Sequence, residues 1–165
     1  MKISKQYLSR GFTLIEILVV IGIIAVLASI VIIAINPAKQ FAQARNTQRQ
    51  SNIEAILNGI GQRMADNRGV FQGSFSNNTY SCPSLPTTTP AFITNGTATS
   101  GQVDLSCLIP TYISVFPTDP ITASGTNTGY TVVVDGSGRV QVCAPASTTE
   151  TSIPDSSANA ICIKR

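Results

Sequence analysis

The sequence of 165 residues contains no histidine and no tryptophan, and only 12% of its residues are charged. Histidine is the side chain that most often serves as a general base or as a metal ligand. The sequence also has no Gly-x-Ser-x-Gly nucleophile elbow and no Cys-x-x-Cys pair. These absences argue against catalysis, so we expect that the protein is not an enzyme and has no catalytic residue and no bound cofactor.

A basic excess of the kind that binds nucleic acid is also missing. The formal net charge is +3, from 11 Lys and Arg against 8 Asp and Glu, but three of the basic residues are Lys2, Lys5 and Arg10. The chain after Gly11 therefore has as many basic as acidic side chains. Because nucleic-acid-binding domains carry a basic patch, we expect no clear nucleic-acid site.

What the sequence does contain is one long apolar run, from Phe12 to Ile35. Only Thr13, Glu16 and Ser29 carry a polar side-chain group in these 24 residues. As a helix the run is roughly 36 Å long, enough to cross a hydrocarbon core of about 30 Å. The basic residues ahead of it should stay cytoplasmic, which predicts a single-pass protein of the inner (cytoplasmic) membrane.

The residues Arg10-Gly11-Phe12-Thr13-Leu14-Ile15-Glu16 resemble the class III signal of type IV pilins and type II secretion pseudopilins. This resemblance implies that a prepilin peptidase cuts between Gly11 and Phe12, removes residues 1–11 as a leader, and methylates the new amine of Phe12. It also implies a homopolymeric filament, and an assembly platform and ATPase as partners. The alternative is a plain N-terminal anchor or an ordinary secretory signal, but the apolar region of an ordinary signal would be shorter and would end at the cleavage site.

Glu16 is the anomaly of the apolar run. A carboxylate costs roughly 2.5–3.5 kcal/mol at the centre of a membrane helix and less near the interface, so it needs a partner. After the cleavage that the resemblance implies, the Phe12 amine lies one helical turn away. Pairing between the Glu16 of one subunit and the amine of its neighbour would set the register of assembly, whereas pairing within one chain would not.

Pro37 follows the apolar run and predicts a helix break. The resemblance places such a proline earlier, within the apolar segment. We therefore expect a transmembrane and filament-core helix over residues 12–36 and an amphipathic helix over 37–68, ended by Gly69. The apolar stripe that should dock the second helix on a sheet is Ile53, Ile56, Leu57, Ile60 and Met64.

Arg45 and Arg49 stand four residues apart in the polar first half of the second helix. Such a polar segment is usually a solvated face. In a filament it would instead contact neighbouring subunits, and the two arginines would pair with Glu54 or Asp66 of another copy.

Four cysteines follow the apolar run, namely Cys82, Cys107, Cys143 and Cys162. In an exported chain an even number of cysteines indicates disulfides. Three pairings are possible, and the entropy of loop closure favours Cys82–Cys107 with Cys143–Cys162. The resemblance to pilins also implies a disulfide near the C-terminus. A zinc site is the alternative, but no His and no metal-type spacing support it.

The C-terminal domain should span residues 69–165. Residues 69–129 are rich in Ser, Thr, Asn, Gly and Pro and predict a loop region, with one short helix over 102–112. Residues 130–165 predict a β-sheet region: a hairpin of 130–134 and 139–143, and a last strand over 160–163. The fold class that we expect is α+β and pilin-like, with a long N-terminal helix packed on a small antiparallel sheet.

Two weaker signals concern ligands and modification. The segment around Asp119 is similar to a calcium-binding region of major pseudopilins, with Asp135 as a second candidate ligand, although both residues are also common turn formers. Asn77-Asn78-Thr79 and Asn95-Gly96-Thr97 fit the N-glycosylation pattern, and O-linked sugar on this Ser/Thr-rich loop is equally conceivable.

The resemblance implies a structural function: a type IV pilus subunit that serves adhesion, motility or DNA uptake, and that is extracellular once assembled. The alternatives are a pseudopilin of a type II secretion system and a minor tip pilin that binds a receptor or DNA.

Overall fold

A computed structural model describes residues 11–75, 78–153 and 159–165 of the chain. Lys2, Lys5 and Arg10 of the expected leader, and Asn77 of the first glycosylation pattern, lie outside the described residues. The chain divides into two compact units, residues 1–40 and 41–165, which are considered separately below.

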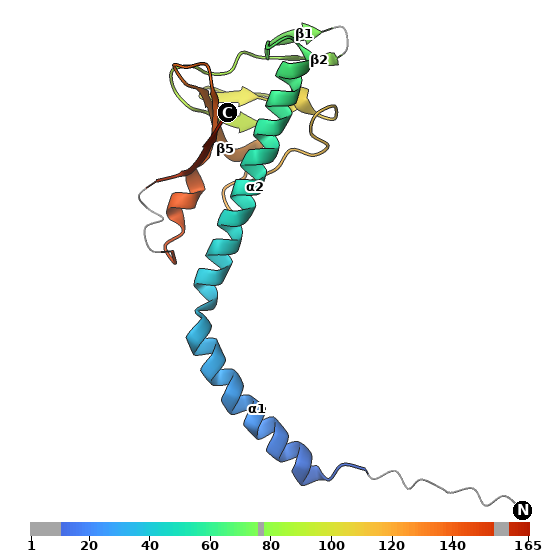
Figure 1. Ribbon diagram of the computed structural model, residues 1–165, viewed down its shortest axis with the longest axis vertical. Helices are drawn as coiled ribbons and strands as arrows, with labels where there is room; N and C mark the ends of the chain where they lie inside the picture. The colour runs from blue at the N-terminus through green and yellow to red at the C-terminus, as the bar shows by residue number, and fades with distance from the viewer. Residues whose placement is uncertain (1–10, 76–77, 154–158) are drawn as a thin grey trace, which may run out of the picture. The chain divides into compact units, whose positions relative to one another are not determined.

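The apolar run forms helix α1, Leu14–Ile35 (Figure 1). It begins two residues later than the run itself because Thr13 is the N-cap and keeps an extended backbone. It ends where Asn36 takes the left-handed conformation, with φ 46° and ψ 79°, which asparagine tolerates better than most residues.

Helix α2, Pro37–Asp66, starts directly after Asn36. The N–H of Lys39 donates to both the backbone and the side-chain oxygen of Asn36. Pro37 occupies the first helical position, where its missing N–H costs nothing. The break expected at Pro37 is thus made by Asn36, and Pro37 opens the second helix. At the other end Gly69 has φ 86°, and its N–H donates to the carbonyl oxygen of Met64 over 2.7 Å.

The second unit contains a five-stranded sheet in the order β4-β3-β5-β6-β7 and a two-stranded sheet of β1 and β2. Neighbouring strands are antiparallel except β3 and β4, which are parallel. The strands are β1 (Gly73–Phe75), β2 (Asn78–Cys82), β3 (Ala91–Thr94), β4 (Gln102–Asp104), β5 (Asn127–Val134), β6 (Val140–Ala144) and β7 (Ile161–Lys164). Two short 3-10 helices are η1 (Ser106–Leu108) and η2 (Pro145–Thr149). The fold is α+β and pilin-like, as expected.

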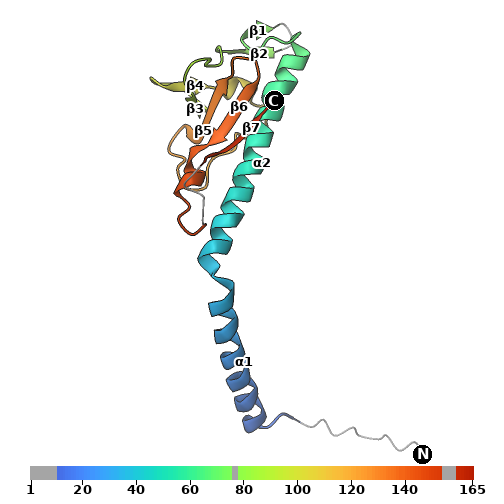
Figure 2. The same ribbon diagram turned by 60° about the vertical axis from the view of Figure 1, so that its left-hand side comes forward.

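Helix α2 packs on one face of the five-stranded sheet (Figure 2). Four residues of the expected stripe are at most 2% exposed, and Met64 packs at the edge of the same core. They meet Ile93, Val132 and Val142 from three strands of the sheet. A Cβ on Gly59 would lie 2.7 Å from Ile113, so this glycine lets the loop that contains Ile113 approach the helix closely.

The expected loop region over 69–129 is wrong in its detail, because it contains β1 to β4 and the start of β5. The expected helix over 102–112 is a strand, β4, followed by the 3-10 turn η1. The reason is tertiary: β4 pairs in parallel with β3, and such short apolar runs fit a strand or a helix equally well. In this segment Val103, Leu105 and Leu108 are buried, and Ile109 is partly buried against the same core.

Candidate functional site

The residues around the expected cleavage position form a capping box at the start of α1. The backbone N–H and the hydroxyl of Thr13 donate to Glu16 Oε2 over 2.7 and 2.8 Å, and the Glu16 N–H donates to Thr13 Oγ1 over 3.3 Å. Gly11 and Phe12 precede the helix, and Phe12 is 85% exposed. The sequence therefore folds so that the Gly11–Phe12 bond lies in exposed, non-helical chain, one residue ahead of the N-cap.

None of the α1 side chains is buried within the chain. The helix is long and apolar enough to cross a membrane, at roughly 33 Å for its 22 residues. Among the residues that the structure describes, no cation lies within ion-pair distance of Glu16. Among these residues Thr13 is the group that donates to its carboxylate.

The second unit contains a network of four charged residues, three of which are buried. Arg49 Nε lies 2.6 Å from Asp119 Oδ2, and Arg49 Nη1 lies 2.6 Å from Glu150 Oε1. Arg45 completes the network by donating to both Glu150 oxygens, over 2.8 and 2.5 Å. The Arg49 and Asp119 side chains are fully buried, and Glu150 is 5% exposed. Among the described residues the network has two cations and two anions, which suits a site where Arg49, Asp119 and Glu150 are buried and Arg45 is partly exposed.

The electrostatics of this network follow from its hydrogen bonds. The Arg45 guanidinium, followed by that of Arg49, lowers the pKa of Glu150 to about 2 against the opposing effect of burial. Burial pushes the pKa of Asp119 upward, but Arg49 and the N–H groups of Thr122 and Ile121 outweigh it, so the pKa is lowered. Both carboxylates are therefore ionised, and the network ties α2 to the loops that contain Asp119 and Glu150.

The expectation that Arg45 and Arg49 form a solvated face, or pair with Glu54 or Asp66 of another copy, is wrong. Arg49 is fully buried, and both arginines find their partners inside their own chain, 70 to 105 residues away. Their four-residue spacing did place them on one side of the helix. No local pattern marks Glu150 as the partner, because η2 brings it to the helix only in the folded domain.

Asp119 and Asp135, the candidate calcium ligands, do not come together. The Asp119 carboxylate accepts from Arg49 and from the N–H groups of Ile121 and Thr122. Asp135 accepts from two backbone N–H groups of its own turn and pairs with Arg139. Within the described residues no group of three metal-ligating side chains exists. Each carboxylate thus has protein donors where a cation would need free oxygens.

Arg63 is a buried cation near the end of α2 that the sequence did not single out. Its Nε donates to the carbonyl oxygen of Phe71 over 2.9 Å, and its Nη2 donates to that of Gly73 over 2.6 Å. The guanidinium also lies 5.7 Å from the centre of the Phe71 ring. Arg63 thereby holds the chain that leads into the β1–β2 pair, which lies beside the C-terminal end of α2 in Figure 1.

Two disulfides close the second unit. Cys82 of β2 bonds to Cys107 of η1 across 25 residues, and Cys143 of β6 bonds to Cys162 of β7 across 19 residues. This is the pairing that we expected from the entropy of loop closure. The second bond joins directly opposite residues of neighbouring antiparallel strands, so it fastens the edge strand β7 to the sheet.

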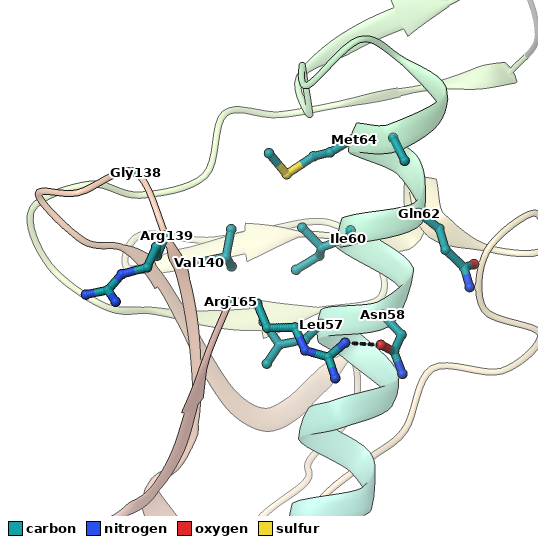
Figure 3. Close-up of a pocket in the computed structure, with 11 residues that line it drawn as sticks. Leu57, Asn58, Ile60, Gln62, Met64, Gly138, Arg139, Val140 and Arg165 are labelled. Atoms are coloured by element: carbon teal, nitrogen blue, oxygen red, sulfur yellow. Dashed lines mark hydrogen bonds between the residues drawn. The ribbon is translucent and has the colours of Figure 1, made fainter.

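An open groove of about 570 Å³ lies between α2 and the turn that joins β5 to β6. In Figure 3 Leu57, Ile60 and Met64 line its helix side and Val140 lies opposite, while Arg165 donates to Asn58 at one end. The Arg139 guanidinium points away from the helix and pairs with Asp135. The surface of the groove is mostly apolar, with polar side chains such as Asn58, Gln62 and Arg165 along its edge.

Comparison with known proteins bears on the N-terminal segment. Residues 8–35 match the family model described as the prokaryotic N-terminal methylation motif. No curated protein matches the chain, and no solved structure matches it. The matched residues contain the Gly11–Phe12 bond, the capping box and the whole of α1. The chain therefore carries the class III signal of type IV pilins and pseudopilins, followed by an α+β domain of pilin-like arrangement.

Proposed function

We propose that the chain is a structural subunit of a type IV pilus filament. The observation that carries this proposal is that α1, which carries the methylation motif, buries none of its side chains within the chain. So much apolar surface has to be covered from outside. Lipid covers it in the precursor, and the α1 helices of other copies cover it in the filament, so assembly exchanges one apolar environment for another.

Processing is the first step of this proposal. A prepilin peptidase cuts between Gly11 and Phe12 and methylates the new amine of Phe12. The exposed, non-helical backbone at these two residues supports this step, because a protease needs an accessible extended peptide. Cleavage there removes the leader and leaves the capping box of Thr13 and Glu16 intact at the new end of the chain.

Pairing of Glu16 with the Phe12 amine of a neighbouring copy is the second step. Thr13 binds the carboxylate but supplies no positive charge, and an unpaired charge is costly once it leaves the membrane interface. The amine made by cleavage is the nearest new cation. Cleavage therefore supplies a charge that neutralises Glu16, which makes assembly depend on processing in this proposal.

The second unit forms the outer surface of the filament in this proposal. The precursor spans the inner membrane once, an assembly platform and ATPase extract it, and the finished pilus is extracellular. There it serves adhesion, motility or DNA uptake. Two disulfides and a buried ion network suit a small domain that has to persist outside the cell.

Mass spectrometry of material sheared from the cell surface tests the proposal. We expect an abundant chain that begins at N-methyl-Phe12 and contains two disulfides. A processed chain found only in the membrane fraction would overturn the pilus assignment in favour of a pseudopilin or a rare minor subunit. A chain that still begins at Met1 in cells with active prepilin peptidase would overturn the family function altogether.

A further inference from the structure

The chain contains two Asn-Gly pairs, Asn58-Gly59 and Asn95-Gly96. In such a pair the backbone nitrogen of glycine can attack the side-chain carbonyl carbon of asparagine, because no Cβ on the following residue obstructs the approach. The reaction requires that this nitrogen and the side-chain amide are free to move together. The two pairs share their chemistry and both asparagines are exposed, but the fold holds the glycine that follows in different ways.

Asn95 lies at the start of the connection between β3 and β4, and it is exposed. Its backbone N–H donates to the carbonyl oxygen of Thr126 over 3.0 Å, which holds the backbone at this point. Within the described residues, neither the Asn95 side chain nor the N–H of Gly96 has a hydrogen-bond partner. Both reacting groups are therefore unengaged among the described residues; Asn95 is exposed and Gly96 is partly buried.

Asn58 lies inside α2, where the N–H of the following residue belongs to the helical hydrogen-bond ladder. Its side-chain oxygen accepts a hydrogen bond from Arg165. Gly59 is buried, and an added Cβ there would meet Ile113 at 2.7 Å. Reaction at Asn58 would need the helix to open against its packed core, so the fold protects this pair.

We propose that Asn95 is a site of spontaneous covalent modification by deamidation. The Gly96 nitrogen forms a bond to Asn95 Cγ and loses its proton, and the side-chain nitrogen leaves as ammonia. The product is a five-membered succinimide. Water then adds to one of its two carbonyl carbons and opens the ring, which yields aspartate or isoaspartate. One water is consumed and one ammonia is released, and no oxidant, reductant or enzyme takes part.

The modification changes the surface of the second unit in two ways. Either product adds one negative charge to a connection that contains none between β3 and β4. Isoaspartate also moves a methylene group into the backbone, between the Asn95 N–H bonded to Thr126 and the Gly96 oxygen that accepts from Thr94 over 2.9 Å. Both products lack the side-chain amide, so Asn95-Gly96-Thr97 can no longer accept an N-linked sugar.

Incubation of the purified full-length chain, in detergent micelles and mildly alkaline buffer made with ¹⁸O-labelled water, tests this inference. Mass spectrometry of the digest then counts heavy oxygen at each Asn-Gly pair, and the label separates this reaction from deamidation during digestion. We expect Asn95 to react at least about tenfold faster than Asn58, because the latter must wait for local unfolding. Equal rates in the folded chain would overturn the proposal.

Two comparisons test whether the fold causes the difference in rate and whether Asn95 is the residue that reacts. In chemically unfolded chain both pairs should react at similar rates, and an Asn58 that stays slow there would show that its protection does not come from the fold. The Asn95→Gln variant should remove the faster reaction, because glutamine would have to close a six-membered ring, while Asn58→Gln should leave it unchanged. Persistence of the fast reaction in Asn95→Gln would also overturn the assignment. None of these outcomes depends on whether the chain forms a filament.

Discussion

Helices α1 and α2 follow one another in the sequence, but they differ in whether their apolar side chains are buried. α1 consists almost wholly of apolar residues and buries none of them within the chain. α2 is polar along much of its length, yet it buries a stripe from Ile53 to Ile60 against a sheet. The stability of the second unit is therefore internal, whereas α1 depends on whatever surrounds it.

The charges of the two helices differ in the same way. Arg49 of α2 is fully buried, and two carboxylates of its own chain neutralise it. Glu16 of α1 is held by a threonine, and no described cation is close enough to pair with it. A charge paired inside the chain contributes to folding, while a charge left for an outside partner can contribute to assembly.

Removal of the Glu16 charge should have the largest effect. Glu16→Gln keeps an oxygen that accepts from Thr13, but it cannot neutralise the Phe12 amine of a neighbour. We expect processed subunits in the membrane and an almost complete loss of filaments, measured by electron microscopy and by immunoblot of sheared material. Ser29→Ala, in the same helix, is the control and should assemble normally. Normal filament yield from Glu16→Gln would show that this carboxylate does not specify assembly.

Removal of the Arg49 charge should damage folding and not assembly as such. Arg49→Met leaves the Asp119 carboxylate buried and removes the cation that pairs with it, so we expect a loss of about 3–5 kcal/mol in the free energy of unfolding. Urea unfolding of the full-length chain in micelles, followed by tyrosine circular dichroism, measures it. The triple variant that adds Asp119→Leu and Glu150→Gln should recover part of the loss. A single variant as stable as wild type would contradict the structural role of the network.

Acid should weaken the same network at Glu150. Its pKa in the folded chain, about 2, is below the ordinary 4.5, so its stabilising contribution is present above pH 4.5 and is lost as the pH falls towards 2. The free-energy gap between wild type and Glu150→Gln should be at most about 3 kcal/mol at neutral pH and should vanish near pH 2. Urea titrations at a series of pH values measure this gap. A gap independent of pH would rule out ionised Glu150 as its cause.

The exposed ion pair of Arg139 and Asp135 should matter least. Arg139 is 59% exposed, and exposed pairs gain little because water and salt screen them. Asp135 would also keep its hydrogen bonds to the backbone of the turn. Arg139→Gln should therefore unfold at the same urea concentration as wild type, within error. A loss in the free energy of unfolding close to that of Arg49→Met would mean that burial does not determine how much these ion pairs contribute to stability.

The sequence predicted the features that depend on neighbours along the chain. The length of α1, the break near Pro37, the buried stripe of α2 and the β5–β6 hairpin all follow from local spacing and turn residues. The short strands in residues 69–129 were missed, since β4 exists only because it pairs with β3. The role of Arg49 was misread for the same reason, because its partners lie 70 and 101 residues away.

The candidate site shows the same division. Seven consecutive residues, Arg10 to Glu16, predict the methylation signal, the Gly11–Phe12 bond and the carboxylate in the apolar run. They are enough because a peptidase and a membrane recognise local chemistry. Only the tertiary structure decided that Asp119 binds an arginine and that Gly59, next to Asn58, packs closely against Ile113. The physical reason is that burial and ion pairing depend on tertiary contacts between segments that are distant in the sequence. Local sequence patterns do not specify those contacts.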